Sequence, residues 1–293
     1  MGKFDFTDTI NNVKESLKKD KKRAGQIGLG NTLESISMEE EDYVVMPDWW
    51  LESFGIPGIQ FGKIVQIAGD SDTGKTSLAL EAMKRAQEQG YGIIYVETEG
   101  KTGDADLILK GIDPSGVMTV SSGITEEAFD GALRLWDAFF EKYPNEKLLL
   151  VFDSFGNTVS MRDSALDLTK EQQRPGGAAK TNRMGINTMI ARMQTDPVAV
   201  LIVNYTYDNI GSVGKVNAGG KALNFFAMLT LQAQRIGWLD ATRKGKKVRL
   251  GAKVKWRVYK NHYAKALLED GEPVLLPPAI ELSITADGFK LIG

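Results

Sequence analysis

Residues 69–76 read GDSDTGKT and lie between an apolar run and a helix-like segment. They fit the pattern G-x-x-x-x-G-K-[ST], in which backbone amides turn inward around phosphate groups at the start of a helix. The lysine of this pattern reaches the β and γ oxygens, and the hydroxyl completes a magnesium shell. We therefore expect the loop to bind a nucleoside triphosphate and Mg²⁺ through Gly69, Asp70, Ser71, Asp72, Thr73, Gly74, Lys75, Thr76 and Ser77.

Short, nearly continuous apolar runs recur along the chain, at 63–68, 92–97, 148–153 and 198–204. Such runs are typical of strands that are buried on both faces of a mostly parallel sheet. Apolar residues at three- and four-residue steps indicate helices between the last runs, within 125–143 and after Lys180. The alternation predicts an α/β fold with a doubly wound, mostly parallel sheet, and ligands at the carboxyl ends of its strands.

The last third of the chain has a different pattern. Val254, Trp256 and Val258 alternate with basic residues, which indicates a strand with one solvent-exposed face. We expect antiparallel strands here, joined by a glycine turn. The tip of this hairpin is basic, either as a surface facing duplex DNA or as a solvated turn, and comprises Arg243, Lys244, Lys246, Lys247 and Arg249.

Composition limits the remaining possibilities. The 293 residues include 36 basic and 38 acidic side chains, so overall charge supplies no attraction for nucleic acid. Cysteine is absent, which excludes disulfides and thiolate metal sites, and no apolar run approaches the length of a membrane span. We expect a soluble, cytoplasmic protein, in which residues 1–42 form an arm and linker with a short helix at 8–22. Residues 43–293 form the core, without a separate C-terminal domain.

Carboxylates follow two of the predicted strands. Asp153 ends the run 148–153, where a magnesium-binding acid is required for nucleotide hydrolysis. A second acid must orient or deprotonate the attacking water, and both Glu97 and Glu99 lie at the end of the run 92–97. These two are spaced by two residues and face the same way on an extended strand, so both remain candidates.

At this point the sequence resembles the RecA family of strand-exchange recombinases. The pieces that carry the likeness occur in the family's order from about residue 45 to 263: FGIPGIQFGKIVQIAGDSDTGKTSLAL, YVETEG, LLLVFDS, VAVLIVNYTYDNIGSVGKVNAGGKALNFFA and RVYKNH. The chain looks most like a compact, phage-type version. The resemblance implies a RecA-like ATPase core of a bacterial cell protein, which uses ATP and Mg²⁺, with the N-terminal arm joining subunits.

The resemblance also implies individual roles. Glu99 aligns with the acid that activates water, so it is preferred over Glu97 and acts with Lys75 in catalysis. Asn204 stands where the family usually has a glutamine that senses the γ-phosphate. Lys260 and His262 match a Lys-x-Lys pair that reaches the ATP of the neighbouring protomer.

Two DNA-binding loops are implied at roughly 158–178 and 205–219. The glycine pair Gly219–Gly220 before a helix is the most specific part of the second loop. The expected DNA contacts, through phosphates, stacking and the glycine backbone, are Arg162, Arg174, Tyr205, Tyr207, Lys215, Gly219 and Gly220.

The leading hypothesis is a DNA-dependent ATPase and recombinase. It forms helical filaments on single-stranded DNA and pairs that strand with a homologous duplex. Further implied partners are a second copy of the chain and a single-strand-binding or mediator protein, with no membrane. Two alternatives remain open: a hexameric helicase-type motor, and an ATP-gated structural or regulatory DNA-binding filament that exchanges no strands.

Overall fold

The computed structural model describes residues 37–165, 177–208, 215–217, 222–264, 268–269 and 272–292. The chain divides into two units between residues 38 and 39, and the description below concerns the second unit. The helix predicted at 8–22 lies outside the described residues. Among the described helices, none combines the length and apolarity needed to cross a membrane.

A nine-stranded sheet organises the described part of the chain. Six neighbouring strands run parallel, and three more add antiparallel at one edge. The order across the sheet is β15 (Gly288–Leu291), β14 (Ala279–Thr285), β11 (Lys246–Asn261), β10 (Leu229–Arg243), β3 (Ile64–Gly69), β7 (Val198–Asn204), β6 (Leu148–Asp153), β4 (Gly92–Glu97) and β5 (Met118–Ser121). The predicted α/β fold with a mostly parallel sheet and added antiparallel strands is confirmed.

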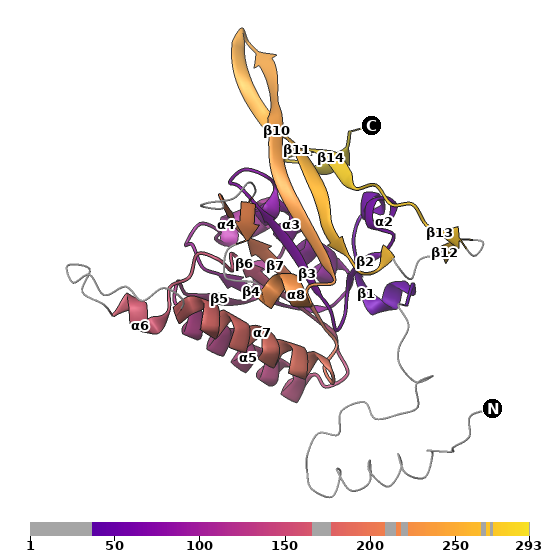
Figure 1. Ribbon diagram of the computed structural model, residues 1–293. Helices are drawn as coiled ribbons and strands as arrows, with labels where there is room; N and C mark the ends of the chain where they lie inside the picture. Colours follow the sequence, from indigo (N-terminus) through magenta and orange to yellow (C-terminus); the bar gives the residue numbers. More distant parts are fainter. Residues whose placement is uncertain are drawn as a thin grey trace, which may run out of the picture. The chain divides into compact units, whose positions relative to one another are not determined.

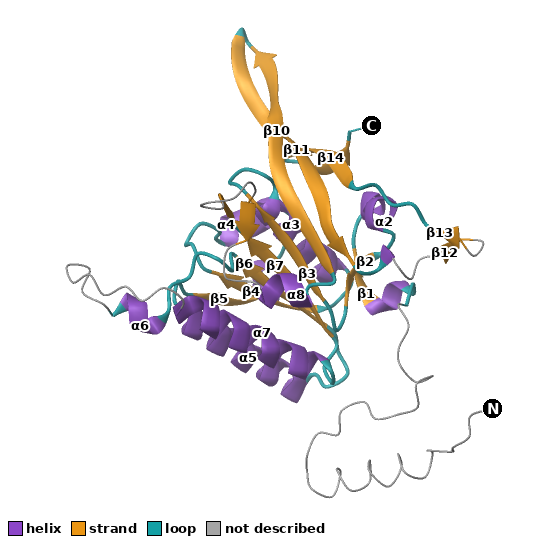
Figure 2. Ribbon diagram, in the orientation of Figure 1, coloured by secondary structure: helices purple, strands orange, loops and turns teal. Residues whose placement is uncertain are grey.

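Helices cover both faces of the parallel strands (Figures 1 and 2). Alternate strand residues, such as Ile94, Leu150 and Val200, pack in one buried cluster with apolar residues of α5 and α7. The residues between them are also buried and point to the opposite face, where α3 lies against β4, β6 and β7. Burial on both faces explains the continuous apolar runs. The helices are α2 (Asp48–Phe54), α3 (Lys75–Glu88), α4 (Asp104–Leu109), α5 (Thr125–Lys142), α6 (Met161–Ser164), α7 (Gly177–Met193) and α8 (Ala222–Phe226), with 3-10 turns η2 (Glu40–Asp42) and η3 (Pro114–Gly116).

Strands β10 and β11 form a long antiparallel hairpin whose tip projects beyond the neighbouring strands (Figure 1). The turn is Lys244–Gly245, and both residues have positive φ, +51° and +72°. At its other end β11 has the predicted alternation, since Val254 and Trp256 are wholly buried while Lys253 is exposed.

The remaining strands form small antiparallel pairs: β1 (Tyr43–Val45) with β2 (Gly58–Gln60), β8 (Thr206–Asp208) with β9 (Lys215–Asn217), and β12 (Leu268–Glu269) with β13 (Glu272–Pro273). The chain turns back after β14, and β15 pairs with it from Leu282 to Thr285. Phe289 of β15 stacks on Trp49 and Trp256, which joins α2 to this edge of the sheet.

Candidate active site

The loop at residues 69–76 leads from the carboxyl end of β3 into α3. Glycine is required at both ends of the loop. A Cβ on Gly69 would lie 2.2 Å from the carbonyl oxygen of Ala233, a backbone atom that cannot move aside. Gly74 has a φ of +85°, and its Cβ would lie 2.1 Å from Ile284. The two glycines therefore allow a tight loop to pack against the antiparallel strands.

Contacts from the loop itself and from strands far along the chain fix the loop's shape. The Thr73 hydroxyl donates to the carbonyl of Asp70 at 2.8 Å, and the indole N–H of Trp256 donates to the carbonyl of Thr73 at 3.1 Å. Arg235 of β10 pairs with Asp72 at 3.1 Å. The cradle is thus already organised by protein contacts. Ser71 is exposed and Ser77 half-buried, with neither in these contacts.

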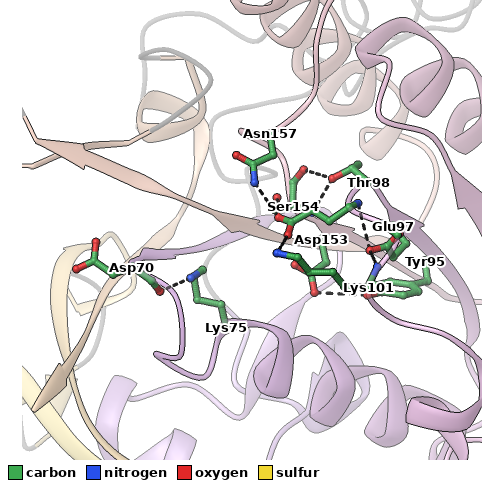
Figure 3. A network of polar contacts seen from close by, with 11 residues as sticks. Asp70, Lys75, Tyr95, Glu97, Thr98, Lys101, Asp153, Ser154 and Asn157 are labelled. Carbon is green, nitrogen blue, oxygen red and sulfur yellow. Dashed lines mark hydrogen bonds and ion pairs between the residues drawn. The ribbon is translucent and has the colours of Figure 1, made fainter. Parts of the chain in front are cut away.

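Lys75 is the buried cation of this loop, with only 6% of its surface exposed. Its ammonium donates to the carbonyl oxygen of Asp70 at 2.5 Å (Figure 3). Burial lowers the pKa of Lys75 to about 8, against the attraction of Asp153 and Asp70. A phosphate oxygen that replaced this carbonyl as acceptor would give the Lys75 ammonium a negatively charged partner. The loop is therefore suited to binding a polyphosphate.

Asp153 ends β6 beside the first turn of α3, and it is buried. It accepts hydrogen bonds from Thr76 and from the Tyr95 hydroxyl, the latter at 3.4 Å. Burial raises the pKa of Asp153 to about 6; the Thr76 hydrogen bond opposes the rise and the charge of Glu99 adds to it. A hydroxyl and an adjacent carboxylate are oxygen ligands of the kind that Mg²⁺ takes together with phosphates and water. No larger acidic or histidine cluster suited to a metal occurs among the described residues.

Glu97 and Glu99, which sequence spacing left as equals, have different environments. The carboxylate of Glu97 is buried and turns back onto its own chain. It accepts the backbone N–H groups of Glu99, Gly100 and Lys101 at 3.2, 2.6 and 3.0 Å. Both oxygens are engaged in holding this turn, so Glu97 has a structural role.

Glu99 faces a set of hydrogen-bond donors that includes Lys101, Ser154 and Asn157. Ser154 and Asn157 donate to the same carboxylate oxygen at 2.6 and 3.0 Å, and Lys101 pairs with the other oxygen. Burial acts to raise the pKa of Glu99, but hydrogen bonds from Lys101, Ser154 and Tyr205 outweigh it and lower the pKa to about 2. Glu99 is therefore an ionised carboxylate at neutral pH, as a proton acceptor must be.

The end of β7 also contacts this site. Asn204 is wholly buried, and its side-chain oxygen accepts the backbone N–H of Tyr205 at 2.9 Å. The ammonium of Lys75 lies 4.6 Å from the centre of the Tyr205 ring. Thr206 donates to the carboxylate of Asp70 at 3.2 Å. The Tyr205 side chain thus lies against the phosphate-binding loop, and its stacking on DNA bases stays a prediction.

Comparison with known proteins agrees with this arrangement. A sequence model described as the RecA N-terminal domain matches residues 21–274. The chain belongs to the RecA family. Its relatives include proteins named Protein RecA from Malacoplasma penetrans (27% identical over 215 residues, 72% of this chain and 62% of that one), Mycoplasma genitalium (28% over 217 residues, 73% and 61%) and Fusobacterium nucleatum (24% over 226 residues, 76% and 57%). The chain thus spans about three fifths of the length of these RecA relatives.

The RecA resemblance predicts that Lys260 and His262 reach the ATP of a neighbouring protomer. Lys260 lies near the end of β11, and His262 follows its last residue. The ammonium of Lys260 donates to the carbonyls of Asn224 and Phe225 at 3.0 and 2.8 Å, which caps the last turn of α8. Burial lowers the pKa of Lys260. The backbone N–H of His262 donates to the carbonyl of Met228, while its side chain is exposed. A contact of either residue with a second RecA-family protomer stays a prediction.

The predicted DNA contacts fall partly within the described residues. Arg162 is exposed on α6, and Tyr207 and Lys215 belong to the paired strands β8 and β9. Contacts of these residues with DNA stay predictions. The other predicted residues lie outside the described residues: Arg174, Gly219 and Gly220.

The projecting hairpin carries an arginine–aromatic stack that the sequence did not predict. The guanidinium groups of Arg235 and Arg249 lie 4.1 and 3.8 Å from the ring centre of Trp238. Asp240 pairs with Lys247 at 3.0 Å and with Arg249 at 3.5 Å. An acid on β10 therefore neutralises part of the predicted basic patch, which lies on the paired strand β11.

Sequence reasoning missed several residues of the RecA-like site. Ser154 directly follows Asp153, the predicted magnesium ligand, and Lys101 follows Glu99, the predicted catalytic acid, by two residues, so their proximity in sequence was a usable signal. Asn157 lies three residues beyond Ser154 and is brought back by the turn after β6. Trp256 gave no such signal, because its bond to the loop joins residues 183 positions apart.

Proposed function

We propose that the protein is an ATP-dependent DNA recombinase, which assembles on single-stranded DNA and pairs it with a homologous duplex. The observation that carries this proposal is the convergence of Lys75, Asp153 and Glu99 at the carboxyl ends of the parallel strands β3, β6 and β4, of which β4 and β6 are neighbours and β3 lies one strand beyond β6. A RecA-family chain with this arrangement has the parts for nucleotide hydrolysis. We infer strand exchange and filament formation from the chain's membership of the RecA family and from the name RecA that its relatives carry.

Binding of ATP falls to the loop between β3 and α3. Its backbone amides and the Lys75 ammonium receive the phosphates, and the buried position of Lys75 makes each new anionic contact strong. Thr76 and Asp153 would hold the magnesium ion, which supplies charge neutralisation between the β- and γ-phosphates.

Hydrolysis uses Glu99 as the proton acceptor. The carboxylate accepts a proton from water while the water oxygen forms a bond to the γ-phosphorus and the bond to the β,γ-bridging oxygen breaks. ADP and phosphate are the products. Ser154, Asn157 and Lys101 fix the direction of the carboxylate, since each donates to it. A positioned base of this kind contributes about 10²–10⁴-fold to rate.

The hairpin β10–β11 supports a role in gathering duplex DNA. Lys244 and Lys246 at its tip are exposed. Replacing both with alanine should weaken duplex binding and reduce the slope of log affinity against log salt by about 2, since each phosphate contact contributes about 0.9. Lys290→Ala, on β15, is a matched control that should leave the slope unchanged. An unaltered slope in the double variant would remove the hairpin from the DNA-binding surface.

Strand exchange itself is tested by a D-loop assay with a labelled single strand and a homologous supercoiled duplex. The account expects product that requires ATP and homology, with filaments on single-stranded DNA visible by electron microscopy. DNA-stimulated hydrolysis without D-loop product would contradict recombination and favour a DNA-binding filament that does not exchange strands. Closed rings instead of filaments would favour the helicase alternative.

A further inference from the structure

The phosphate-binding loop carries two acidic side chains, which is unfavourable for a site that receives a polyanion. Asp70 and Asp72 both lie within residues 69–76. Burial lowers the pKa of Lys75, and both acids are among the charges that oppose this shift. The two carboxylates therefore act on the same ammonium that would receive the phosphates. A negative charge this close to the phosphates weakens their binding unless a cation compensates for it.

Asp72 has such a cation in Arg235 of β10. The guanidinium donates to the Asp72 carboxylate at 3.1 Å, and the side chains of Asp72 and Arg235 are 66% and 36% exposed. The φ of Asp72 is +58°, a left-handed conformation that aspartate and asparagine adopt more readily than most other side chains. Asparagine at this position would therefore keep the backbone conformation and remove only the charge.

A register shift in the long hairpin brings Arg235 and Trp238 to the same face. Strand β10 runs beside β3 as far as the pair Ala233 and Gly69, so Arg235 lies next to the loop that follows β3. Residues three apart on a regular strand point to opposite faces. The shift between Arg235 and Gly237 adds one residue to β10, which places the side chains of Arg235 and Trp238 on one face.

A second register shift leaves Leu250 as an extra residue of β11. It brings Arg249 to the face that carries Trp238 and Asp240. The guanidinium groups of Arg235 and Arg249 lie 4.1 and 3.8 Å from the ring centre of Trp238, within the range of cation–π contacts. Arg249 in turn pairs with Asp240 at 3.5 Å. The Trp238 ring thus restricts the positions open to the Arg235 guanidinium beside the loop.

We propose that Arg235 is the counter-charge that allows the acidic phosphate-binding loop to bind ATP, and that its stack on Trp238 holds it in this place. The base of the hairpin then belongs to the nucleotide site. This inference rests on the proposed function, since it requires ATP in the loop. Arg235 acts through Asp72 and is a positioning residue, so its loss should raise the Kd and KM for ATP with little change in kcat.

The test measures the Kd of a fluorescent Mg·ATP analogue without DNA, for wild type, Arg235→Gln, Asp72→Asn and the double variant. Both side chains of the pair are partly exposed, so we expect Arg235→Gln to raise the Kd about three- to fivefold at low salt. The double variant removes the uncompensated carboxylate and should return to within about 1.5-fold of wild type. Asp72→Asn alone should bind at least as tightly as wild type.

The stack and the salt dependence provide two further measurements. Trp238→Leu should raise the Kd about twofold, and Trp238→Phe, which keeps an aromatic ring, should restore wild-type affinity. Raising the salt from about 0.05 to about 0.5 M should reduce the difference between Arg235→Gln and wild type, because salt screens the exposed carboxylate.

The matched control is Arg134→Gln, which breaks the exposed ion pair of Arg134 with Asp130 on α5. It should leave the Kd of the analogue unchanged. Thermal unfolding of each variant shows whether the protein is folded, and Asp72→Asn tests the inference with Arg235 and its stack intact.

Several outcomes would overturn the inference. An unchanged Kd in Arg235→Gln would exclude a counter-charge role. A double variant that binds no better than Arg235→Gln would mean that Arg235 does not act through Asp72. Weaker binding in Asp72→Asn would mean that the carboxylate assists the nucleotide. If wild type does not bind the analogue, the proposed function fails first. Tight wild-type binding that all four Arg235, Asp72 and Trp238 single variants share defeats this inference alone.

Discussion

Exchanging each glutamate at the end of β4 for glutamine should separate stability from catalysis. Glu97 holds the backbone of the turn, whereas Glu99 faces the side chains of the site. We expect Glu97→Gln to lower the free energy of unfolding more than Glu99→Gln does. Glu99→Gln should lower kcat more than Glu97→Gln does.

The magnitudes follow from the contacts. One oxygen of Glu97 accepts the N–H groups of Glu99 and Lys101, and the other accepts that of Gly100. Glutamine keeps one oxygen and turns an NH₂ group toward a backbone N–H, which leaves at least one buried donor without an acceptor. That loss is about 1.5–3 kcal/mol. In Glu99→Gln the retained oxygen still accepts from its neighbours, and the side chain of Lys101 is 71% exposed, so solvent screens the lost ion pair and its loss has little effect on stability.

The assays are urea unfolding followed by circular dichroism, and steady-state ATP hydrolysis under saturating nucleotide. Glu99→Gln should reduce kcat about 10²–10⁴-fold, the contribution of a general base. The reasoning is refuted if Glu97→Gln unfolds like wild type and abolishes hydrolysis as completely as Glu99→Gln. The base would then be Glu97, and the turn contacts would not decide the role.

Three further predictions concern the cradle, the late strand and pH. Gly69→Ala should lower the free energy of unfolding by more than about 3 kcal/mol, because the added Cβ meets a backbone carbonyl. The control Gly123→Ala adds a Cβ with only an ordinary contact at 3.7 Å and should change the free energy of unfolding by less than about 1 kcal/mol. Equal melting curves for the two variants would contradict this prediction. Lys260→Met should cost about 1–2 kcal/mol in urea unfolding through the lost cap on α8, and no change would mean that water replaces the cap. The pKa of Asp153 is raised to about 6, so below that pH a proton competes with magnesium for its carboxylate. Binding of a fluorescent Mg·ATP analogue should therefore weaken from pH 7 to pH 5. An affinity that stays constant over this range would contradict the raised pKa.

The sequence was sufficient for the parallel core because burial on both faces leaves a strong mark. A strand such as β6 has no polar face, so its apolar run is unbroken until Asp153, the charged residue that ends it. The phosphate-binding loop was equally predictable, since its glycines satisfy local backbone requirements. The apolar strands and the phosphate-binding loop both depend on residues that are close together in the sequence, so local patterns reveal them.

Side-chain direction after a strand was not predictable. Glu97 and Glu99 share a face on an extended chain, but β4 ends at Glu97 and the following turn sends the two carboxylates to different partners. Tyr205 lies between the end of β7 and the start of β8, so the alternation of neither strand sets the direction of its side chain. Long-range contacts such as that of Trp256 depend on how distant strands are placed, which local patterns do not encode.

The most direct test of a DNA-coupled ATPase is steady-state hydrolysis by the full chain with and without single-stranded DNA, measured beside Glu99→Gln. The account predicts strong stimulation by DNA and its disappearance in the variant, with nucleotide binding retained. Hydrolysis that is indifferent to DNA, or unaffected by Glu99→Gln, would contradict it.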